Sequence, residues 1–268
     1  MLRGANRARC WTTAIMRIFA ISDLHVDYED NAHWITSLSS SEFRNDVLIV
    51  AGDISDSLHL LEWTLKSLVA RFRSVLFVPG NHDLWVVQDK EITSSLVKFE
   101  QVCSVAGAAG ASMSAFHGNG LCILPLLGWY DYSFGQPTIA LLRGWNDYRA
   151  CRWPARYEVN DIAAYFDQKN LPPKMVDGDM VISFSHFLPR IDVMPDYIPV
   201  DKRVLYPVLG TTRLERRIRE LKSNIHVYGH SHVNRRTDID GVTYVNNAFG
   251  YPHETRIAAK QLACIHSV

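Results

Sequence analysis

The stretch FVPGNHDLW, residues 77–85, begins like a buried strand and ends in a cluster of polar side chains. The apolar run 75–78 stops at a Pro-Gly pair, which typically ends regular structure. Three residues able to bind protons or metals follow in a row: Asn81, His82 and Asp83. The pattern is consistent either with a polar turn or with one wall of a functional site.

The same pattern recurs along the chain, because several short apolar runs are separated by segments of helical periodicity. These runs are rich in β-branched and aromatic residues and too short for helices. Alternating strands and helices predict an α/β protein. The predicted strands are Arg17 to Ser22, Val47 to Ala51, Val75 to Val78, Leu121 to Leu126, Met180 to Phe184, Ile225 to Tyr228 and Val242 to Val245.

Five of these strands are followed directly by carboxylate, imidazole or amide side chains. In α/β folds, ligands bind at the carboxyl ends of the strands. If the strands share an orientation, these side chains converge at one edge. They are Asp23 and His25, Asp53, Asn81 with His82 and Asp83, His186, and His230 with His232.

The convergent residues have the chemistry of a metal site. Imidazole nitrogens and carboxylate oxygens are common ligands of Zn, Mn and Fe. Seven ligands drawn from these nine residues would exceed the needs of one tetrahedral ion but suit two ions that share a bridging carboxylate, a device for hydrolysing phosphate esters. With only Asp23 and Asp53 as charged ligands, the site keeps a positive charge that attracts an anionic phosphoryl group.

Each motif alone is weak evidence, because a single histidine after a strand is more often structural than a ligand. Together, however, the motifs Asp-x-His, Gly-Asp, Gly-Asn-His-Asp, His and Gly-His-x-His resemble the signature of the calcineurin-like metallophosphoesterases. The resemblance spans Arg17 to about Gly250. It implies a four-layer α/β/β/α sandwich of two mixed β-sheets flanked by helices, with the site at the strand ends.

The resemblance also implies a role for each residue and a pair of divalent or transition metal ions, Mn, Fe, Zn or Ni. A metal-bound hydroxide is expected to attack phosphorus directly. His82 is expected to stabilise or protonate the leaving group, and Asp83 to orient His82 by a hydrogen bond. The implied ligands are Asp23, His25 and His232 for one metal, Asn81, His186 and His230 for the other, and Asp53 as the bridge.

Departures from the family pattern narrow the expected substrate. Ser57 and Pro79 stand where serine/threonine protein phosphatases of the family carry arginines, and Asp56 stands near the position of the tyrosine ligand of purple acid phosphatases. We therefore expect a small phosphodiester or nucleotide substrate rather than a phosphomonoester. The alternatives are an inactive scaffold that binds proteins, or a nuclease acting on short oligonucleotides.

The segment of about residues 128–157 is an insert rich in aromatics and arginines, with weak periodicity. It either packs its rings on the domain or covers the site. Trp129 and Tyr130 in the insert, together with Arg190 in the loop after His186, are the candidate substrate contacts.

Composition limits the remaining possibilities. The 268 residues carry no formal net charge, so long nucleic acid is not an expected partner. Five dispersed cysteines favour a reducing compartment, and no apolar run approaches the ~20 residues needed to span a bilayer. We expect a cytoplasmic protein with one domain at 16–268. Residues 1–15 are expected to be a disordered tail or to precede a true start at Met16; their arginines leave mitochondrial targeting as an alternative.

Overall fold

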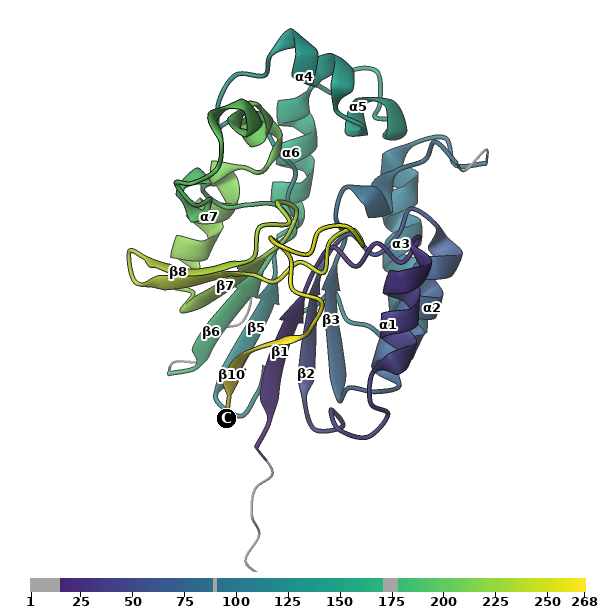
Figure 1. The fold of residues 1–268 in the computed structure, drawn as a ribbon, viewed down its shortest axis with the longest axis vertical. Coiled ribbons are helices and arrows are strands. Elements are labelled where there is room, and N and C mark those ends of the chain that lie inside the picture. Colours follow the sequence, from purple (N-terminus) through teal and green to yellow (C-terminus); the bar gives the residue numbers. More distant parts are fainter. Residues whose placement is uncertain (1–14, 89–90, 171–177) are drawn as a thin grey trace, which may run out of the picture.

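The computed structural model describes residues 15–88, 91–170 and 178–268, and within them the chain forms two β-sheets flanked by helices (Figure 1). Apart from Ile15, the predicted N-terminal tail lies outside the described residues. The strands are β1 Arg17–Ile21, β2 Val47–Ala51, β3 Ser74–Val78, β4 Phe116–Gly118, β5 Leu121–Pro125, β6 Met180–Phe184, β7 Ile225–Tyr228, β8 Arg235–Ile239, β9 Val242–Asn246 and β10 Ala263–Ser267.

The first sheet has the strand order β10-β1-β2-β3, and the second β4-β5-β6-β7-β9-β8. In the first sheet β1, β2 and β3 are parallel, and β10 is antiparallel to β1. In the second, β5, β6, β7 and β9 are parallel, and the edge strands β4 and β8 are antiparallel to their neighbours. Both sheets are therefore mixed, as the resemblance implies.

Helices cover the outer face of each sheet, which completes four layers. In Figure 1, α1, α2 and α3 lie on the side of β3, α7 lies on the opposite side of the molecule near β7 and β8, and α6 stands above the second sheet. Among the described residues, no helix combines the length and the hydrophobicity needed to cross a membrane. The α-helices are α1 Glu29–Ser37, α2 Leu58–Val69, α3 Ser95–Ala109, α4 Ile139–Gly144, α5 Asp147–Ala150, α6 Val159–Lys169 and α7 Thr212–Glu220, and the 3₁₀ helices are η1 His82–Leu84, η2 Ile191–Val193 and η3 Val200–Val208.

Strand β2 shows how the layers are held together. Every residue of this strand is fully buried, and successive side chains of a strand point to opposite faces. Ile49 and Ala51 belong to the apolar cluster between the sheets, with Ile182 and Val227 of the second sheet. Leu48 and Val50 belong to the cluster that includes the helices. Burial on both faces explains the continuous apolar sequence of the strand.

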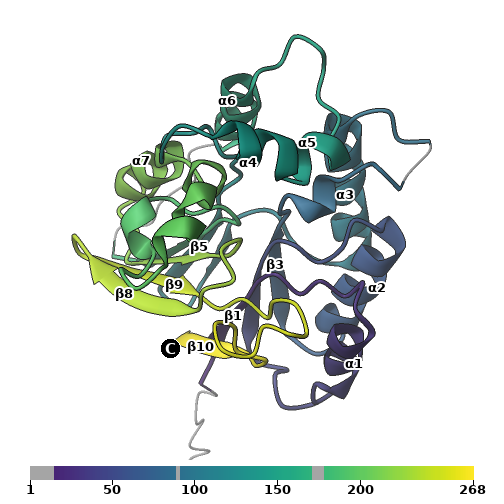
Figure 2. The same ribbon diagram turned by 45° about the horizontal axis from the view of Figure 1, so that its top comes forward.

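The parallel strands direct their carboxyl ends to one edge of the sandwich. In Figure 1 these ends point toward α4 and α5, which lie above this edge, and Figure 2 shows the two helices between the halves of the molecule. Both helices belong to the insert predicted at residues 128–157, so the insert covers the edge where the polar motifs emerge.

Candidate metal centre

The loops that carry the predicted ligands adopt an uncommon backbone conformation. Positive φ angles are rare for residues other than glycine, and such strain, on the order of 1–3 kcal/mol per residue, persists where the surrounding structure fixes it. Backbone hydrogen bonds from Asp23 N to Gly52 O (2.9 Å) and from His25 N to Asp53 O (3.0 Å) fix two of these loops together. The predicted ligands with positive φ are Asp23 (53°), His25 (42°), Asp53 (56°), His230 (67°) and His232 (55°).

Two glycines permit the close approach of these loops. Gly52 has a φ of 85°, and a Cβ at this position would lie 2.5 Å from Nδ1 of His186. A Cβ on Gly80 would overlap the carboxylate of Asp53. The glycines of the Gly-Asp and Gly-Asn-His-Asp motifs are thus required for sterics as well as for the turn.

The first group of possible metal ligands comprises Asp23, His25 and His232, all buried, whose ligand atoms lie within 4.8 Å of one another. Nε2 of His25 is 3.1 Å from Nε2 of His232, and the latter is 3.3 Å from Oδ1 of Asp23. The carboxylate of Asp23 also accepts hydrogen bonds from the backbone N–H of His230 (3.0 Å) and from the hydroxyl of Ser22.

The second group comprises Asp53, His186 and His230, also buried and within the same mutual distance. Nε2 of His186 lies 3.4 Å from Oδ2 of Asp53, 3.1 Å from Nδ1 of His230 and 3.0 Å from Oδ1 of Asn81. Asp53 also belongs to a third group, with His25 and His82. Its carboxylate therefore lies between the first and the second group.

The second group fits a cation because acceptor atoms converge there. Nδ1 of His186 contacts the carbonyl of Ala51 (2.9 Å), and Nε2 of His230 contacts the carbonyl of Val208 (3.1 Å). A carbonyl only accepts, so these nitrogens carry the ring protons. Burial lowers the pKa of both histidines, which keeps the rings neutral. The other ring nitrogens, Nε2 of His186 and Nδ1 of His230, are then unprotonated. They lie close together and Nε2 of His186 lies close to Oδ1 of Asn81, so three lone pairs meet with no proton between them.

His232 is oriented by a carboxylate that sequence reasoning missed. Nδ1 of His232 lies 2.6 Å from Oε2 of Glu254, which also accepts from the backbone N–H of Tyr251 (2.8 Å). Burial opposes a charge on His232, but Asp23 and Glu254 outweigh it and raise the pKa of His232 to about 10. Carboxylates commonly hold metal-binding histidines in this way. No sequence signal identifies Glu254, because its loop follows no recognisable motif.

His82 lies at the open side of the centre. Its ring stacks on Trp85 with centroids 3.6 Å apart, and its Nε2 is 4.0 Å from Oδ2 of Asp53. Burial, with the nearby His186 and His232, lowers the pKa of His82 to about 3. The ring is therefore neutral at ordinary pH and keeps one N–H donor.

The expected hydrogen bond from Asp83 to His82 is wrong. Oδ2 of Asp83 accepts from the backbone N–H of Gly80 (2.8 Å) and Asp53 (2.9 Å), and Oδ1 accepts from those of Ile54 (2.9 Å) and Ser55 (3.0 Å). The side chain of Asp83 is fully buried behind the loop. Because its oxygens are used by these amides, Asp83 braces the loop that presents Asp53 instead of orienting His82.

Two pockets adjoin the centre and share His82, Trp85, Asn146 and Tyr251. One, of about 370 Å³, extends past Trp145 and Leu205, and contains the ligand candidates Asp53, Asn81, His230 and His232. The other, of about 280 Å³, is lined by His25, Asp27, Tyr28, Asp56 and Gln88. Sequence reasoning did not single out Trp85, Asn146 or Tyr251 as pocket residues.

The candidate substrate contacts lie away from these two pockets. Trp129 and Tyr130 are 1% and 2% exposed and belong to the apolar core. The guanidinium of Arg190 is engaged by Asp192 (2.6 Å), Asp240 (2.9 Å) and Glu215 (3.3 Å). None of the three side chains lines either pocket beside His82.

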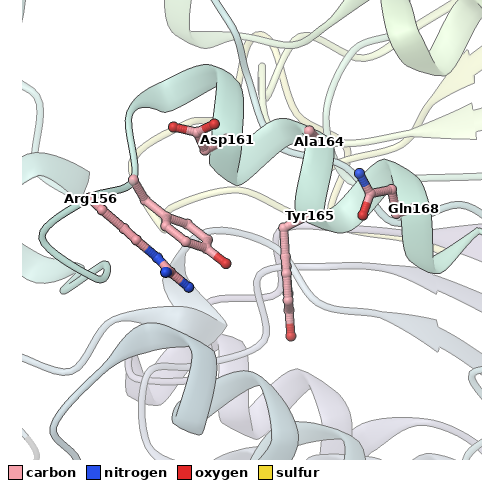
Figure 3. A pocket seen from close by; sticks show the side chains of 6 residues that line it. Arg156, Asp161, Ala164, Tyr165 and Gln168 are labelled. Carbon is pink, nitrogen blue, oxygen red and sulfur yellow. The ribbon is translucent and has the colours of Figure 1, made fainter.

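A further pocket, of about 300 Å³, lies on α6 and the segment before it, apart from the candidate ligands. Figure 3 shows Asp161, Ala164 and Gln168 along the helix and Arg156 beside it. None of its lining residues belongs to the metal-ligand groups, so we assign the chemistry to the pockets beside His82.

Comparisons with known proteins agree with this geometry. The acyl-carrier-protein phosphodiesterase PptH of Mycobacterium tuberculosis strain H37Rv is 28% identical over an alignment of 266 residues. The match covers 89% of this chain and 79% of PptH. The crystal structure of the phosphopantetheinyl hydrolase PptH from Mycobacterium tuberculosis matches with a TM-score of 0.73 at 25% identity, covering 91% of this chain and 92% of that chain. The profile of the calcineurin-like phosphoesterases matches residues 16–234. The chain therefore belongs to the calcineurin-like phosphoesterase family and is a phosphoric ester hydrolase.

Proposed function

We propose that this protein hydrolyses a phosphodiester with two divalent metal ions. Asp23, His25 and His232 would hold one ion, and His186, His230 and Asn81 the other, with Asp53 shared. The observation that carries the proposal is the position of Asp53 between two buried ligand groups. The convergence of lone pairs at His186, His230 and Asn81 supports it independently.

When bound, such a pair of ions lowers the pKa of water and neutralises charge on phosphoryl oxygens. The side chains supply the rest of the chemistry. His82, neutral and 18% exposed at its side chain, can donate its ring N–H to a phosphoryl or departing oxygen. Stacking on Trp85 fixes the plane of the ring. The backbone amides bound by Asp83 tie the loop of Asp53 to the turn that carries His82.

A diester is supported by the shape of the site. A phosphodiester carries two substituents, and the two pockets that share His82 and Trp85 offer each a place. Both volumes, about 370 and 280 Å³, are near the size of small-molecule sites. The similar protein PptH is a phosphodiesterase, in line with a diester here.

The specific substrate we propose is a phosphopantetheinyl diester on an acyl carrier protein. This follows the activity in the names of PptH, an acyl-carrier-protein phosphodiesterase and phosphopantetheinyl hydrolase. The described residues that line the two pockets include no lysine or arginine. Among these described lining residues, phosphate groups beyond the reacting one would find no guanidinium or ammonium partner, which disfavours nucleotides and oligonucleotides relative to an uncharged chain.

The test compares three substrates with purified protein loaded with manganese: bis(p-nitrophenyl) phosphate, p-nitrophenyl phosphate and a phosphopantetheinylated carrier protein. We expect hydrolysis of the diester to exceed that of the monoester. Mass spectrometry should show the carrier protein losing its phosphopantetheine. Asp53→Asn serves as the inactive control. If the model diester is hydrolysed rapidly but the carrier protein stays intact, the proposed substrate is rejected. If none of the three substrates is hydrolysed in a metal-dependent way, the proposed function is rejected.

A further inference from the structure

Asp147, on the short helix α5 of the insert, is buried at 2% exposure and is among the residues that line the pocket of about 370 Å³ at the metal centre. Its carboxylate accepts hydrogen bonds from two side chains of the distant segment 81–85 and from Trp145, two residues before it. Oδ1 receives the Nδ2 of Asn81 (2.9 Å) and the Nε1 of Trp85 (2.7 Å), and Oδ2 receives the Nε1 of Trp145 (2.8 Å). The hydroxyl of Tyr130 also donates to it.

The bond to Asn81 decides which way its amide points. Burial raises the pKa of Asp147, but both of its oxygens face N–H donors. The carboxylate therefore acts as an acceptor and binds the NH₂ group of Asn81 in preference to the amide oxygen. Oδ1 of Asn81 is thereby turned toward Nε2 of His186, 3.0 Å away. A flipped amide would place two oxygens against each other at Asp147 and present a donor to the proposed metal.

The two indole donors, Trp85 and Trp145, shape the larger pocket. Trp85 and Trp145 both line the pocket of about 370 Å³, and Trp85 also supports the ring of His82. The indole N–H of each ring is partly buried and needs a hydrogen-bond acceptor, which Asp147 provides. A single carboxylate therefore fixes a candidate metal ligand and two walls of the substrate pocket.

We infer that Asp147 is a positioning residue that orients Asn81 toward the second metal ion and holds Trp85 and Trp145 in the substrate pocket. The inference rests on the proposed metal site, and it gives the insert a role beyond covering the edge of the sheets. Tyr130, expected to contact substrate, serves as one of the donors that hold this carboxylate.

The variant Asp147→Asn keeps the size of the side chain but places an NH₂ group against at least one N–H donor. We expect its affinity for one of two manganese ions, measured by isothermal titration calorimetry with elemental analysis, to fall about 10–100-fold. The KM for bis(p-nitrophenyl) phosphate should rise as well. Trp145→Phe removes only a pocket donor and should raise KM while manganese affinity changes less than threefold.

Asp167→Asn is the matched control, because Asp167 is another largely buried carboxylate (8% exposed) that binds Arg216 and Arg217 on α7, away from the metal centre. This control should lose thermal stability without losing manganese affinity. The double variant Asn81→Asp/Asp147→Asn restores a donor facing an acceptor. It should bind manganese more tightly than Asn81→Asp alone, in which two carboxylates face each other.

The outcomes separate the inference from the proposed function. A wild-type protein that binds no manganese rejects the metal site itself. If the wild type binds two ions and Asp147→Asn binds them equally well, the positioning role is overturned. A soluble double variant that binds no better than Asn81→Asp also overturns it, and this comparison decides the question even if Asp147→Asn alone does not fold.

Discussion

Glu254 accepts a hydrogen bond from Nδ1 of His232 at 2.6 Å across 22 residues of sequence, and thereby turns Nε2 of His232 toward Asp23. The family profile ends at residue 234, so this contact comes from a segment that lies beyond the profile match. The metal centre is thus completed by a C-terminal loop that carries both Glu254 and Tyr251.

Replacing Glu254 with alanine should weaken metal binding without abolishing the fold. His232 would lose the acceptor for Nδ1, and losses of about 10–100-fold in affinity are typical when such a partner is removed. Manganese titration of the purified variant measures the effect. Glu254→Gln should lose less, because its amide oxygen can still accept. Equal affinity in Glu254→Ala and in the control Glu62→Ala, on the exterior of α2, would show that the contact does not orient a ligand.

Replacing Asp83 with asparagine should destabilise the protein as well as the site. The new NH₂ group would face two of the four backbone N–H groups that the carboxylate now binds. Each charge-assisted bond lost costs about 1.5–3 kcal/mol. Urea denaturation of the metal-free protein should show a free energy of unfolding that is lower by at least the value of one such bond. A variant as stable as the wild type but slow in catalysis would instead favour the orienting role toward His82.

Replacing His82 with alanine should separate catalysis from metal binding. Its ring is not part of the two groups that we assign as ligands, so manganese stoichiometry should be unchanged. The loss of a donor to the reacting oxygens should lower kcat by roughly 10²–10⁴-fold. Elemental analysis and steady-state kinetics on the same sample provide the measurement. A variant that loses a metal ion would make His82 a ligand instead.

The buried His226 should make stability depend on pH. Ser183 and Ser185 contact its two ring nitrogens at 2.8 and 3.0 Å, and burial lowers its pKa to about 3. Its pKa in the unfolded chain is about 6.5, so between pH 6.5 and pH 3 the unfolded state binds a proton that the folded state does not bind. The contribution is complete above pH 6.5 and declines toward pH 3 by up to about 1.4 kcal/mol per pH unit.

Urea denaturation of the wild type and of His226→Gln between pH 7 and pH 5 tests this dependence, because other histidines contribute equally to both proteins. The wild type should lose more stability than the variant over this range. Parallel curves would mean that His226 is not held neutral in the fold.

The sequence predicted the buried strands well because their residues are apolar on both faces. For β2, β6 and β7 the predicted bounds agree with the structure. β2 is a continuous apolar run, and β6 and β7 are apolar apart from Ser183 and His226. The edge strands β8 and β10 were not predicted. The sequence of β8, RRTDI, alternates partly buried and exposed positions, and that of β10, ACIHS, has one buried residue. Both include polar residues, so they lack the apolar signal.

The candidate site divides in a similar way. The proposed ligands stand in short motifs directly after strands, so the local sequence is enough to identify them. Asp147 and Glu254 act on Asn81 and His232 from 66 and 22 residues away, and only folding creates these contacts. The role of Asp83 was misjudged because adjacency in sequence suggested a bond to His82, whereas the tight 3₁₀ turn directs its carboxylate at the preceding loop.

The central claim is that seven side chains hold two metal ions around Asp53. Anomalous diffraction from crystals of the manganese-loaded protein tests it most directly. We predict two peaks about 3.5–4 Å apart, one beside Asp23, His25 and His232, the other beside Asn81, His186 and His230, with Asp53 touching both. A single peak, or none at full manganese loading, would contradict the account.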